Sequence, residues 1–126
     1  MDKQIVNTSS APPPIGPYNQ AIFTGNLLFI SGQICLDPLT GDLKNRNVQE
    51  ETHQVMKNLS AILTQAGLSF ANVVKTSIFI TDMNKFSEIN EVYANYFENN
   101  YPARETVQIA ALPKFVSVEI SMIAAK

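Results

Sequence analysis

The sequence predicts an α+β fold in which a mixed β-sheet is covered on one face by two helices. Three observations predict it. Short β-branched and aromatic segments are separated by turn residues, two longer segments repeat apolar residues at spacings of three and four, and the two kinds of segment alternate. The expected order is β-β-β-α-β-α-β-β. Because two helices can cover only one face of such a sheet, the other face needs a different cover.

Three strands are expected in the first third of the chain. They are residues 3–7, 18–24 and 27–34, and the last two meet at Gly25-Asn26, a sequence typical of hairpin turns. The intervening run TSSAPPPIGP suits neither a helix nor a central strand, because proline removes backbone donors. We expect this run to be an extended surface loop.

Two amphipathic helices follow, separated by a β-branched strand at residues 73–81. The first has an apolar stripe made of Thr52, Val55, Met56, Leu59, Ile62, Leu63 and Ala66. Asn47, with Glu50 three residues later, is a good N-cap, and Gly67 is a good stop. The second helix carries Phe86, Ile89, Tyr93, Tyr96 and Phe97.

The last quarter of the chain, YPARETVQIAALPKFVSVEISMIAAK, is expected to form two neighbouring strands around a tight turn at residues 112–114. Arg104 stands at the start of the first strand, and Glu119 lies in the middle of the second. A charge inside an otherwise apolar strand costs free energy unless it is paired or used. This predicted hairpin is therefore where we expect the functional residues.

Side-chain alternation predicts which residues of the hairpin face the helices. The helix-covered face is expected to carry Val107, Ile109, Val116, Val118, Ile120 and Met122. The other face is expected to carry Arg104, Thr106, Gln108, Ser117, Glu119 and Ser121, beside Val74, Thr76, Ile78 and Ile80 of the middle strand. A mixed polar and apolar face is a poor solvent surface and a good subunit interface. We therefore expect an oligomer with polar groups between its subunits.

Composition excludes several classes of protein. The 126 residues suffice for one domain, which we expect over residues 1–126. The net charge is −2 and the basic residues are scattered, so the chain lacks the basic stripe that is typical of nucleic-acid binders. No apolar run approaches the roughly 20 residues that span a bilayer, and no signal-peptide pattern is present, so we expect a cytoplasmic protein. A single cysteine, Cys35, excludes an internal disulfide, and one Cys with one His cannot build a usual zinc site within the chain.

Five motifs resemble the RidA family, also called the YjgF or reactive intermediate deaminase family and formerly endoribonuclease L-PSP or translation inhibitor. They are GPY at 16–18, ISGQI at 30–34, VVKTSIFITDMNKFSEIN at 73–90, YPAR at 101–104 and ALPKFVSVEI at 111–120. The resemblance implies a chorismate-mutase-like fold and a homotrimer with sites between subunits. It also implies hydrolysis of 2-imino acids, such as 2-iminobutyrate and 2-iminopropanoate, to 2-keto acids and ammonia, which protects PLP enzymes.

The two catalytic roles are expected on Arg104, which matches the family's substrate-carboxylate arginine in the YPAR motif, and on Glu119, whose chemistry suits the second role. A guanidinium is planar and permanently charged, so Arg104 suits the substrate carboxylate. Glu119 suits the holding of a water and the transfer of a proton. The alternatives are a surface arginine and a structural carboxylate that pairs with Arg104 or the backbone. No metal or cofactor is required, because a protonated imine is already electrophilic.

Five further residues match substrate-binding positions of the family. They are Tyr18, Ser31, Gly32, Asn90 and Thr106. Gly32 would let a ligand approach the backbone and its N–H, and the alternative is a bulge or close strand packing. Thr106 stands where many members carry a cysteine, which removes thiol chemistry at that position and leaves substrate preference open.

Two other functions remain open. A non-catalytic regulatory protein that binds a keto acid or related carboxylate needs only Arg104. An endoribonuclease or translation inhibitor is less consistent with the acidic balance, the scattered basic residues and the single His53, which lies off the apolar stripe.

Overall fold

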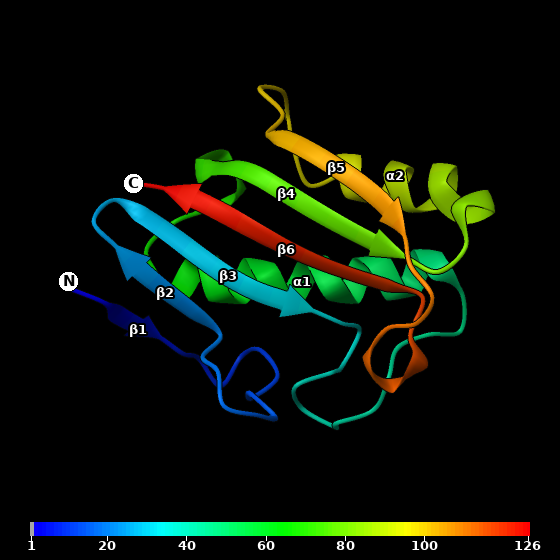
Figure 1. The fold of residues 1–126 in the computed structure, drawn as a ribbon, viewed down its shortest axis with the longest axis horizontal. Helices are drawn as coiled ribbons and strands as arrows, with labels where there is room; N and C mark the ends of the chain where they lie inside the picture. The colour runs from blue at the N-terminus through cyan, green and yellow to red at the C-terminus, as the bar shows by residue number, and fades with distance from the viewer. Residues whose placement is uncertain (1) are drawn as a thin grey trace.

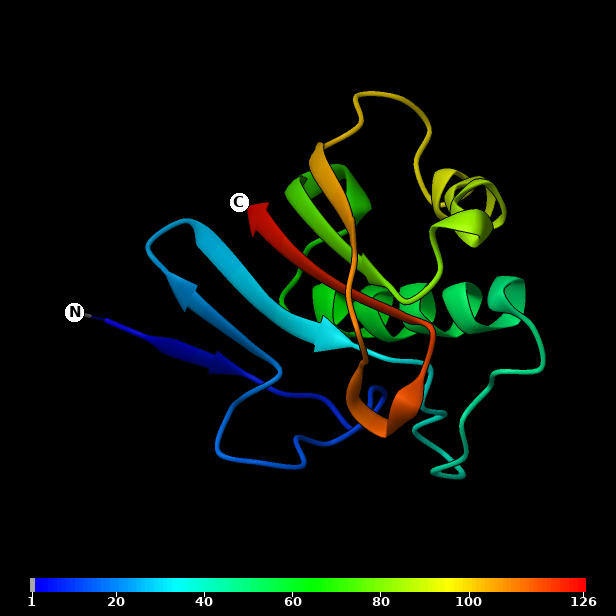
Figure 2. The ribbon, with the colours of Figure 1, turned by 45° about the vertical axis from the view of Figure 1, so that its right-hand side comes forward.

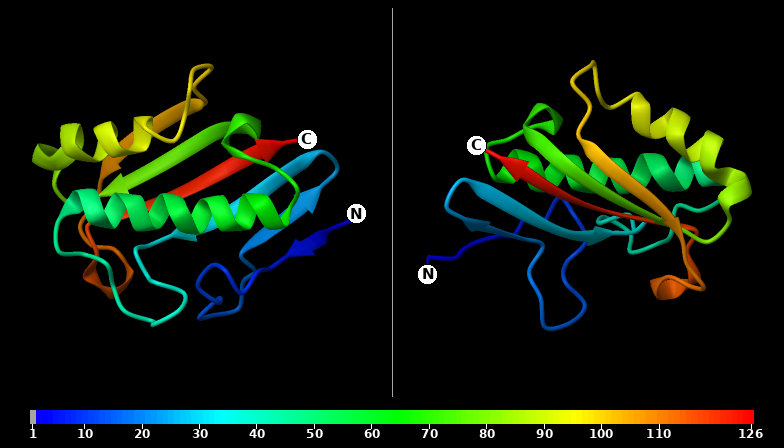
Figure 3. Two further views of the ribbon diagram at one scale, coloured as in Figure 1. Left: turned by 180° about the vertical axis from the view of Figure 1, so that it is seen from behind. Right: turned by 45° about the horizontal axis from the view of Figure 1, so that its top comes forward.

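A mixed six-stranded sheet with two α-helices on one face makes up the described part of the chain (Figure 1). The computed structural model describes residues 2–126. The elements are β1 (Gln4–Val6), β2 (Ala21–Thr24), β3 (Leu27–Gln33), α1 (Val48–Gln65), β4 (Val73–Ile80), α2 (Phe86–Ala94), β5 (Ala103–Gln108) and β6 (Val118–Ala125). The predicted order is confirmed, and Figure 3 shows both helices crossing the same face. No helix within residues 2–126 is long and apolar enough to cross a membrane.

The expected C-terminal hairpin is wrong. The strands lie in the order β1-β2-β3-β6-β4-β5, so β4 separates β5 from β6. The β4-α2-β5 connection makes β5 parallel to β4 at the sheet edge, and β6 then returns antiparallel between β3 and β4. The short 3₁₀ turn Pro113–Phe115 lies on this return path. The turn at residues 112–114 therefore does not join two paired strands. The connection from β5 to β6 carries the chain past β4, so that β6 pairs with the other side of β4.

The expected faces of β4 and β5 are also wrong, whereas those of β6 are correct. Val118, Ile120 and Met122 of β6 are buried under the helices. Side chains of paired residues point to the same side of a sheet. Arg104 pairs with Thr76, which is buried on the helix face, and so Arg104 lies on that side.

The same register places Thr106 beside Ile78 and Gln108 beside Ile80, both on the helix face. Val107 pairs with Phe79, which pairs with Glu119, so these three lie on the opposite, open face. Alternation divides a strand into two sets of side chains but does not state which set the helices cover. For the edge strand β5, the helices cover the polar set.

Helix α1 has the predicted ends and the predicted stripe. The Asn47 side chain accepts a hydrogen bond from the backbone N–H of Glu50 at 2.8 Å, and Gly67 follows the helix with φ +78°. Two buried polar residues on this helix were not predicted. Glu51 is 2% exposed, and its Oε1 accepts from the N–H groups of Ser117 (2.6 Å) and Val118 (3.1 Å). Glu51 therefore ties the start of β6 to α1.

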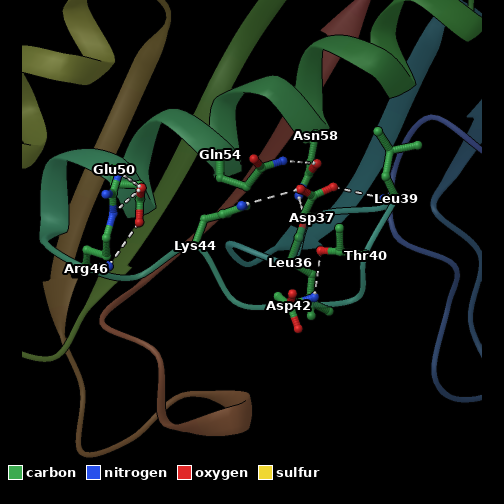
Figure 4. Close-up of polar contacts among 10 residues, drawn as sticks. All are labelled: Leu36, Asp37, Leu39, Thr40, Asp42, Lys44, Arg46, Glu50, Gln54 and Asn58. Carbon is green, nitrogen blue, oxygen red and sulfur yellow. Dashed lines mark hydrogen bonds and ion pairs between the residues drawn. The ribbon is translucent and has the colours of Figure 1, made fainter.

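Asn58 is the second unpredicted polar residue and is 1% exposed. Its Nδ2 donates to the carbonyl oxygens of Ile34 (3.1 Å) and Leu36 (2.9 Å), just after β3. Gln54 donates to Asn58 Oδ1 at 3.0 Å, and an ion pair of 3.7 Å joins Lys44 to Asp37 across the same loop (Figure 4). Asn58 thus attaches the end of β3 to the helix layer.

Replacement of Asn58 tests this attachment. Asn58→Ala leaves the carbonyls of Ile34 and Leu36 without their donor inside the protein, so we expect a loss of about 1–3 kcal/mol in the free energy of unfolding. Urea denaturation measures it. The matched control is Lys57→Ala, an exposed neighbour on the same helix, for which we expect a change within about 0.5 kcal/mol. Equal stability of the two variants would contradict the role assigned to Asn58.

Candidate active site

A pocket of about 190 Å³ lies where β3 ends and β6 begins, and Glu119 lines it. Its other walls come from the proline-rich loop 7–20 and the turn after β5. Figure 2 shows the loop in blue and the turn in orange at this end of the sheet. Six residues define this Glu119 pocket for the argument below: Ile15, Tyr18, Gln20, Gly32, Pro113 and Glu119. The structure therefore brings together three of the predicted site residues, Tyr18, Gly32 and Glu119.

The carboxyl group of Glu119 is partly removed from water by this pocket. Burial raises the pKa of Glu119 above its ordinary value, because a charge loses solvation among apolar walls. Within residues 2–126 the ion pairs do not include Glu119, so no neighbouring cation offsets this effect. A raised pKa makes the ionised carboxylate a stronger base, which suits it to accept and return a proton.

Gly32 gives Glu119 room to lie against the backbone of β3. A Cβ atom added at Gly32 would come within 2.7 Å of Glu119 Oε2 and 2.8 Å of its Cδ. We predicted that glycine at this position allows a ligand to approach the backbone. In the structure the group that approaches the backbone of Gly32 is the Glu119 side chain of the same chain. The sheet register shifts between Ile30 and Gln33, so the close contact lies at an irregularity of β3.

Tyr18 and Ser31 hold the loop near Gly32. The Tyr18 ring is 47% exposed, and its hydroxyl accepts a hydrogen bond from the backbone N–H of Ile15 at 3.4 Å. Ser31 Oγ donates to the carbonyl of Asn19 at 2.6 Å. Tyr18 is thus available at the pocket wall, whereas the Ser31 hydroxyl is already used by the loop.

A second group of predicted residues surrounds Arg104 on the helix side of β5. Arg104 Nη1 donates to Asn90 Oδ1 at 2.7 Å, and the guanidinium carbon lies 5.1 Å from the Tyr93 ring centroid and 5.6 Å from that of Phe86. Asn90, Tyr93 and Phe86 all belong to α2. This Arg104 cluster fixes the guanidinium while most of its five N–H donors remain available.

Thr106 lies two residues further along the same side of β5. Its Oγ1 is buried and is the side-chain polar atom that finds no hydrogen-bond partner within residues 2–126. A buried hydroxyl without a partner is unusual, because most such groups are paired.

The single cysteine, Cys35, is also buried. Burial together with the Glu51 carboxylate raises the pKa of the Cys35 thiol to about 12. This thiol is therefore protonated at neutral pH.

The structure does not bring Arg104 and Glu119 together within one chain. The sequence predicted that both residues share the face of the sheet away from the helices, and this is wrong for Arg104. Arg104 contacts α2, whereas Glu119 lies on the open face beside Phe79. Within residues 2–126, no three His, Cys, Asp or Glu side chains are grouped so that they could hold a metal ion.

The sequence also missed Gln20, which is 1% exposed and lines the Glu119 pocket. The available signal was its position, directly after a proline-rich segment that is poor in backbone donors and directly before an apolar strand.

Comparison with known proteins agrees with this fold. The family model described as Endoribonuclease L-PSP matches residues 8–126. The chain belongs to this family. A RutC family protein of Pyrococcus horikoshii is 48% identical over 98% of each chain, and the human 2-iminobutanoate/2-iminopropanoate deaminase is 45% identical over 97% of this chain and 89% of the human protein.

A solved relative confirms the fold class. The crystal structure of E. coli TdcF with bound serine superposes with a TM-score of 0.94 at 43% identity, over 98% of each chain. The resemblance to the RidA family and the expected chorismate-mutase-like α+β fold are thus confirmed.

Gly32→Ala tests the close contact in the Glu119 pocket. The new Cβ overlaps the Glu119 carboxyl group, which is the end of a flexible side chain and can move away. We expect the free energy of unfolding to fall by no more than about 1 kcal/mol. Carboxyl titration followed by carbon NMR should show the Glu119 pKa moving back toward its ordinary value, because the displaced group reaches water. An unchanged titration would show that Gly32 does not position Glu119.

The raised pKa of Glu119 also predicts how stability depends on pH. Since the folded state binds this proton more tightly than the unfolded state, ionisation destabilises the fold as pH rises from the unfolded pKa through the folded one. We therefore expect Glu119→Gln to gain stability relative to the parent as pH rises above the ordinary glutamate pKa of about 4.3, measured by urea denaturation.

The control for this measurement is Glu105→Gln. Hydrogen bonds from Lys75 and Ser77 lower the pKa of Glu105, so its loss should act in the opposite direction as pH rises. We expect the change to be small because Glu105 is exposed to solvent. The same sign for both variants would refute the desolvation of Glu119.

Proposed function

We propose that this protein hydrolyses reactive 2-imino acids of the 2-iminobutanoate and 2-iminopropanoate type to 2-keto acids and ammonia. The observation that carries the proposal is Glu119, a carboxyl group with a raised pKa that lies against the bare backbone of Gly32 in a largely apolar pocket. Mammalian relatives about as similar as the human protein carry the same deaminase name, which supports the reaction class.

The reaction needs one base that later acts as an acid. The Glu119 carboxylate holds a water and takes its proton as the oxygen attacks the imine carbon, which forms a tetrahedral carbinolamine. The protonated Glu119 then returns the proton to the nitrogen. As the C–N bond breaks, the carbinolamine hydroxyl gives its proton to the Glu119 carboxylate and becomes the carbonyl, and the departing ammonia takes that proton and leaves as ammonium. One water is consumed for each imine, no electrons are transferred, and Glu119 ends in its starting state.

Arg104 anchors the substrate carboxylate in this proposal. Its planar fork matches a carboxylate, and Asn90 together with the rings of Tyr93 and Phe86 holds the guanidinium in place before substrate arrives. The unpartnered hydroxyl of Thr106 lies on the same side of β5 and supplies a further polar contact. A serine bound in the TdcF relative, which also carries a carboxylate, is consistent with such an anchor.

The proposal requires two copies of the chain, because Arg104 and Glu119 lie on opposite faces of one. The Arg104 cluster of one copy completes the Glu119 pocket of the next, and repetition of this contact closes a ring, which we propose is the homotrimer implied by the family. The open face supports such packing, since it exposes Ile5, Leu27, Phe29 and Val107 around the polar Ser77 and Ser121.

A second candidate is a regulatory protein that binds a keto acid or amino acid at the same site without turnover. The specific observation in its favour is the serine in TdcF, a ligand that carries no imine. Glu119 separates the two functions, because binding through Arg104 needs no proton transfer.

A coupled assay tests the proposed reaction. A PLP-dependent threonine dehydratase supplies 2-iminobutanoate, and keto-acid formation is followed with and without this protein. We expect Glu119→Gln to lower kcat by about 10²–10⁴-fold, the usual contribution of a general acid–base group, while keto-acid binding persists. Arg46→Ala, an exposed arginine paired with Glu50, is the control and should be fully active. A parent protein that binds keto acid but never accelerates hydrolysis would favour the regulatory alternative.

Mixing of two inactive variants tests whether the site is shared between copies. We expect Arg104→Ala and Glu119→Gln, each inactive alone, to regain activity when unfolded and refolded together, because some contacts then join an intact Arg104 to an intact Glu119. Random mixing in a ring restores about a quarter of the sites. No recovery from mixed particles of confirmed composition would contradict a shared site.

A further inference from the structure

Gln20 has an unusual concentration of hydrogen bonds for a residue that is 1% exposed. Its Nε2 donates to the carbonyl oxygens of Thr8 (3.0 Å), Ala11 (3.3 Å) and Pro12 (2.8 Å), and its Oε1 accepts from the N–H of Thr8 at 2.6 Å. Both ends of the side-chain amide are therefore used by one short stretch of the loop 7–20. Both N–H groups and the oxygen of this side chain thus take part in loop contacts.

The backbone of Gln20 connects the same loop to the floor of the Glu119 pocket. Its N–H donates to Asn7 Oδ1 at 3.0 Å, and its carbonyl accepts from the N–H of Ser31 at 2.9 Å. Ser31 directly precedes Gly32, on which the Glu119 carboxyl group lies. One residue thus joins the loop that walls the pocket to the strand that forms its floor.

The loop has few backbone donors with which to hold its shape. Prolines occupy positions 12, 13, 14 and 17, so four of its residues have no N–H to donate. Ala11 and Pro12 are buried, and buried carbonyl groups require donors. Gln20 supplies a donor to both of them.

We propose that Gln20 is a positioning residue for the deaminase reaction, which clamps the loop wall that contains Ile15 and Tyr18 at a fixed distance from Gly32 and Glu119. This inference rests on the proposed function. The wall excludes water from Glu119 and confines the substrate beside it, so a displaced wall leaves the carboxyl group solvated and the substrate misaligned. A shift of about 1 Å in such an arrangement costs up to about 100-fold in rate.

A positioning role predicts a particular pattern of kinetic constants. The anchor for the substrate carboxylate, Arg104, lies in a cluster on α2 that makes no use of Gln20. Loss of the clamp should therefore lower kcat about 10–100-fold and leave KM for the imino acid within about threefold. A purely structural role would lower the melting temperature and leave kcat of the folded protein unchanged.

The test compares Gln20→Met with the control Gln65→Met. Methionine keeps the length of glutamine without its hydrogen bonds, and Gln65 is an exposed residue of α1. We measure the exchange of the Thr8 amide by NMR in the full-length protein, together with kcat and KM in the coupled assay. For Gln20→Met we expect rapid exchange of the Thr8 amide and the loss in kcat, and for Gln65→Met we expect the behaviour of the parent.

Gln20→Glu is a second variant in case Gln20→Met does not fold. A glutamate still accepts from the Thr8 N–H but offers no amide donors to the carbonyls of Ala11 and Pro12. For Gln20→Glu we expect the Thr8 amide to stay protected from exchange. We expect its kcat to lie between the kcat of the parent and that of Gln20→Met.

Two results would overturn the inference. Parent-like exchange of Thr8 in Gln20→Met would show that there is no clamp, and rapid exchange with unchanged kcat would show that the clamp does not position the site. A parent protein without deaminase activity would overturn the proposed function instead. The exchange comparison needs no substrate and would still decide whether the clamp exists.

Discussion

The insertion of β6 between β3 and β4 is the constraint on which the rest of the structure depends. Strand β6 pairs with β3 on one side and β4 on the other, and its residues Val118, Ile120 and Met122 are buried beneath the helices. Because side chains alternate along a strand, burying these three residues sends Glu119 to the open face beside Gly32. The Glu51 carboxylate, which accepts from two N–H groups at the start of β6, fixes where the strand begins. The position of the candidate acid–base group is thus a consequence of core packing.

The chemistry proposed for Glu119 arises from what surrounds it rather than from the carboxyl group alone. A glutamate on a polar strand would be solvated and ionised, whereas the proline-rich loop and the turn Pro113–Phe115 remove part of its water and raise its pKa. The loop has few donors of its own and depends on the buried amide of Gln20. Under the proposed function, activity and loop structure are therefore linked through the Gln20 side chain.

The Arg104 cluster and the Glu119 pocket lie on opposite faces because of the register in which β5 pairs with β4. Its pairing with β4 turns Arg104 toward α2, where Asn90, Tyr93 and Phe86 hold the guanidinium. Each chain therefore carries, under the proposed function, one half of two different sites. Under the proposed function, assembly is a requirement of catalysis, since neither half has both the carboxylate anchor and the proton-transfer group.

The sequence by itself determined the order of the elements and indicated the candidate site residues. The apolar stripe, Asn47 cap and Gly67 stop of α1 are local features, and local spacing is sufficient to predict them. The motifs around Gly32 and Glu119 indicated the family. Only the tertiary structure decided that β5 pairs with β4, that Arg104 faces the helices, and that Gln20, Glu51 and Asn58 are buried. These outcomes depend on which distant segments meet, and a one-residue change of register or a change of strand partner reverses a face without altering any local pattern.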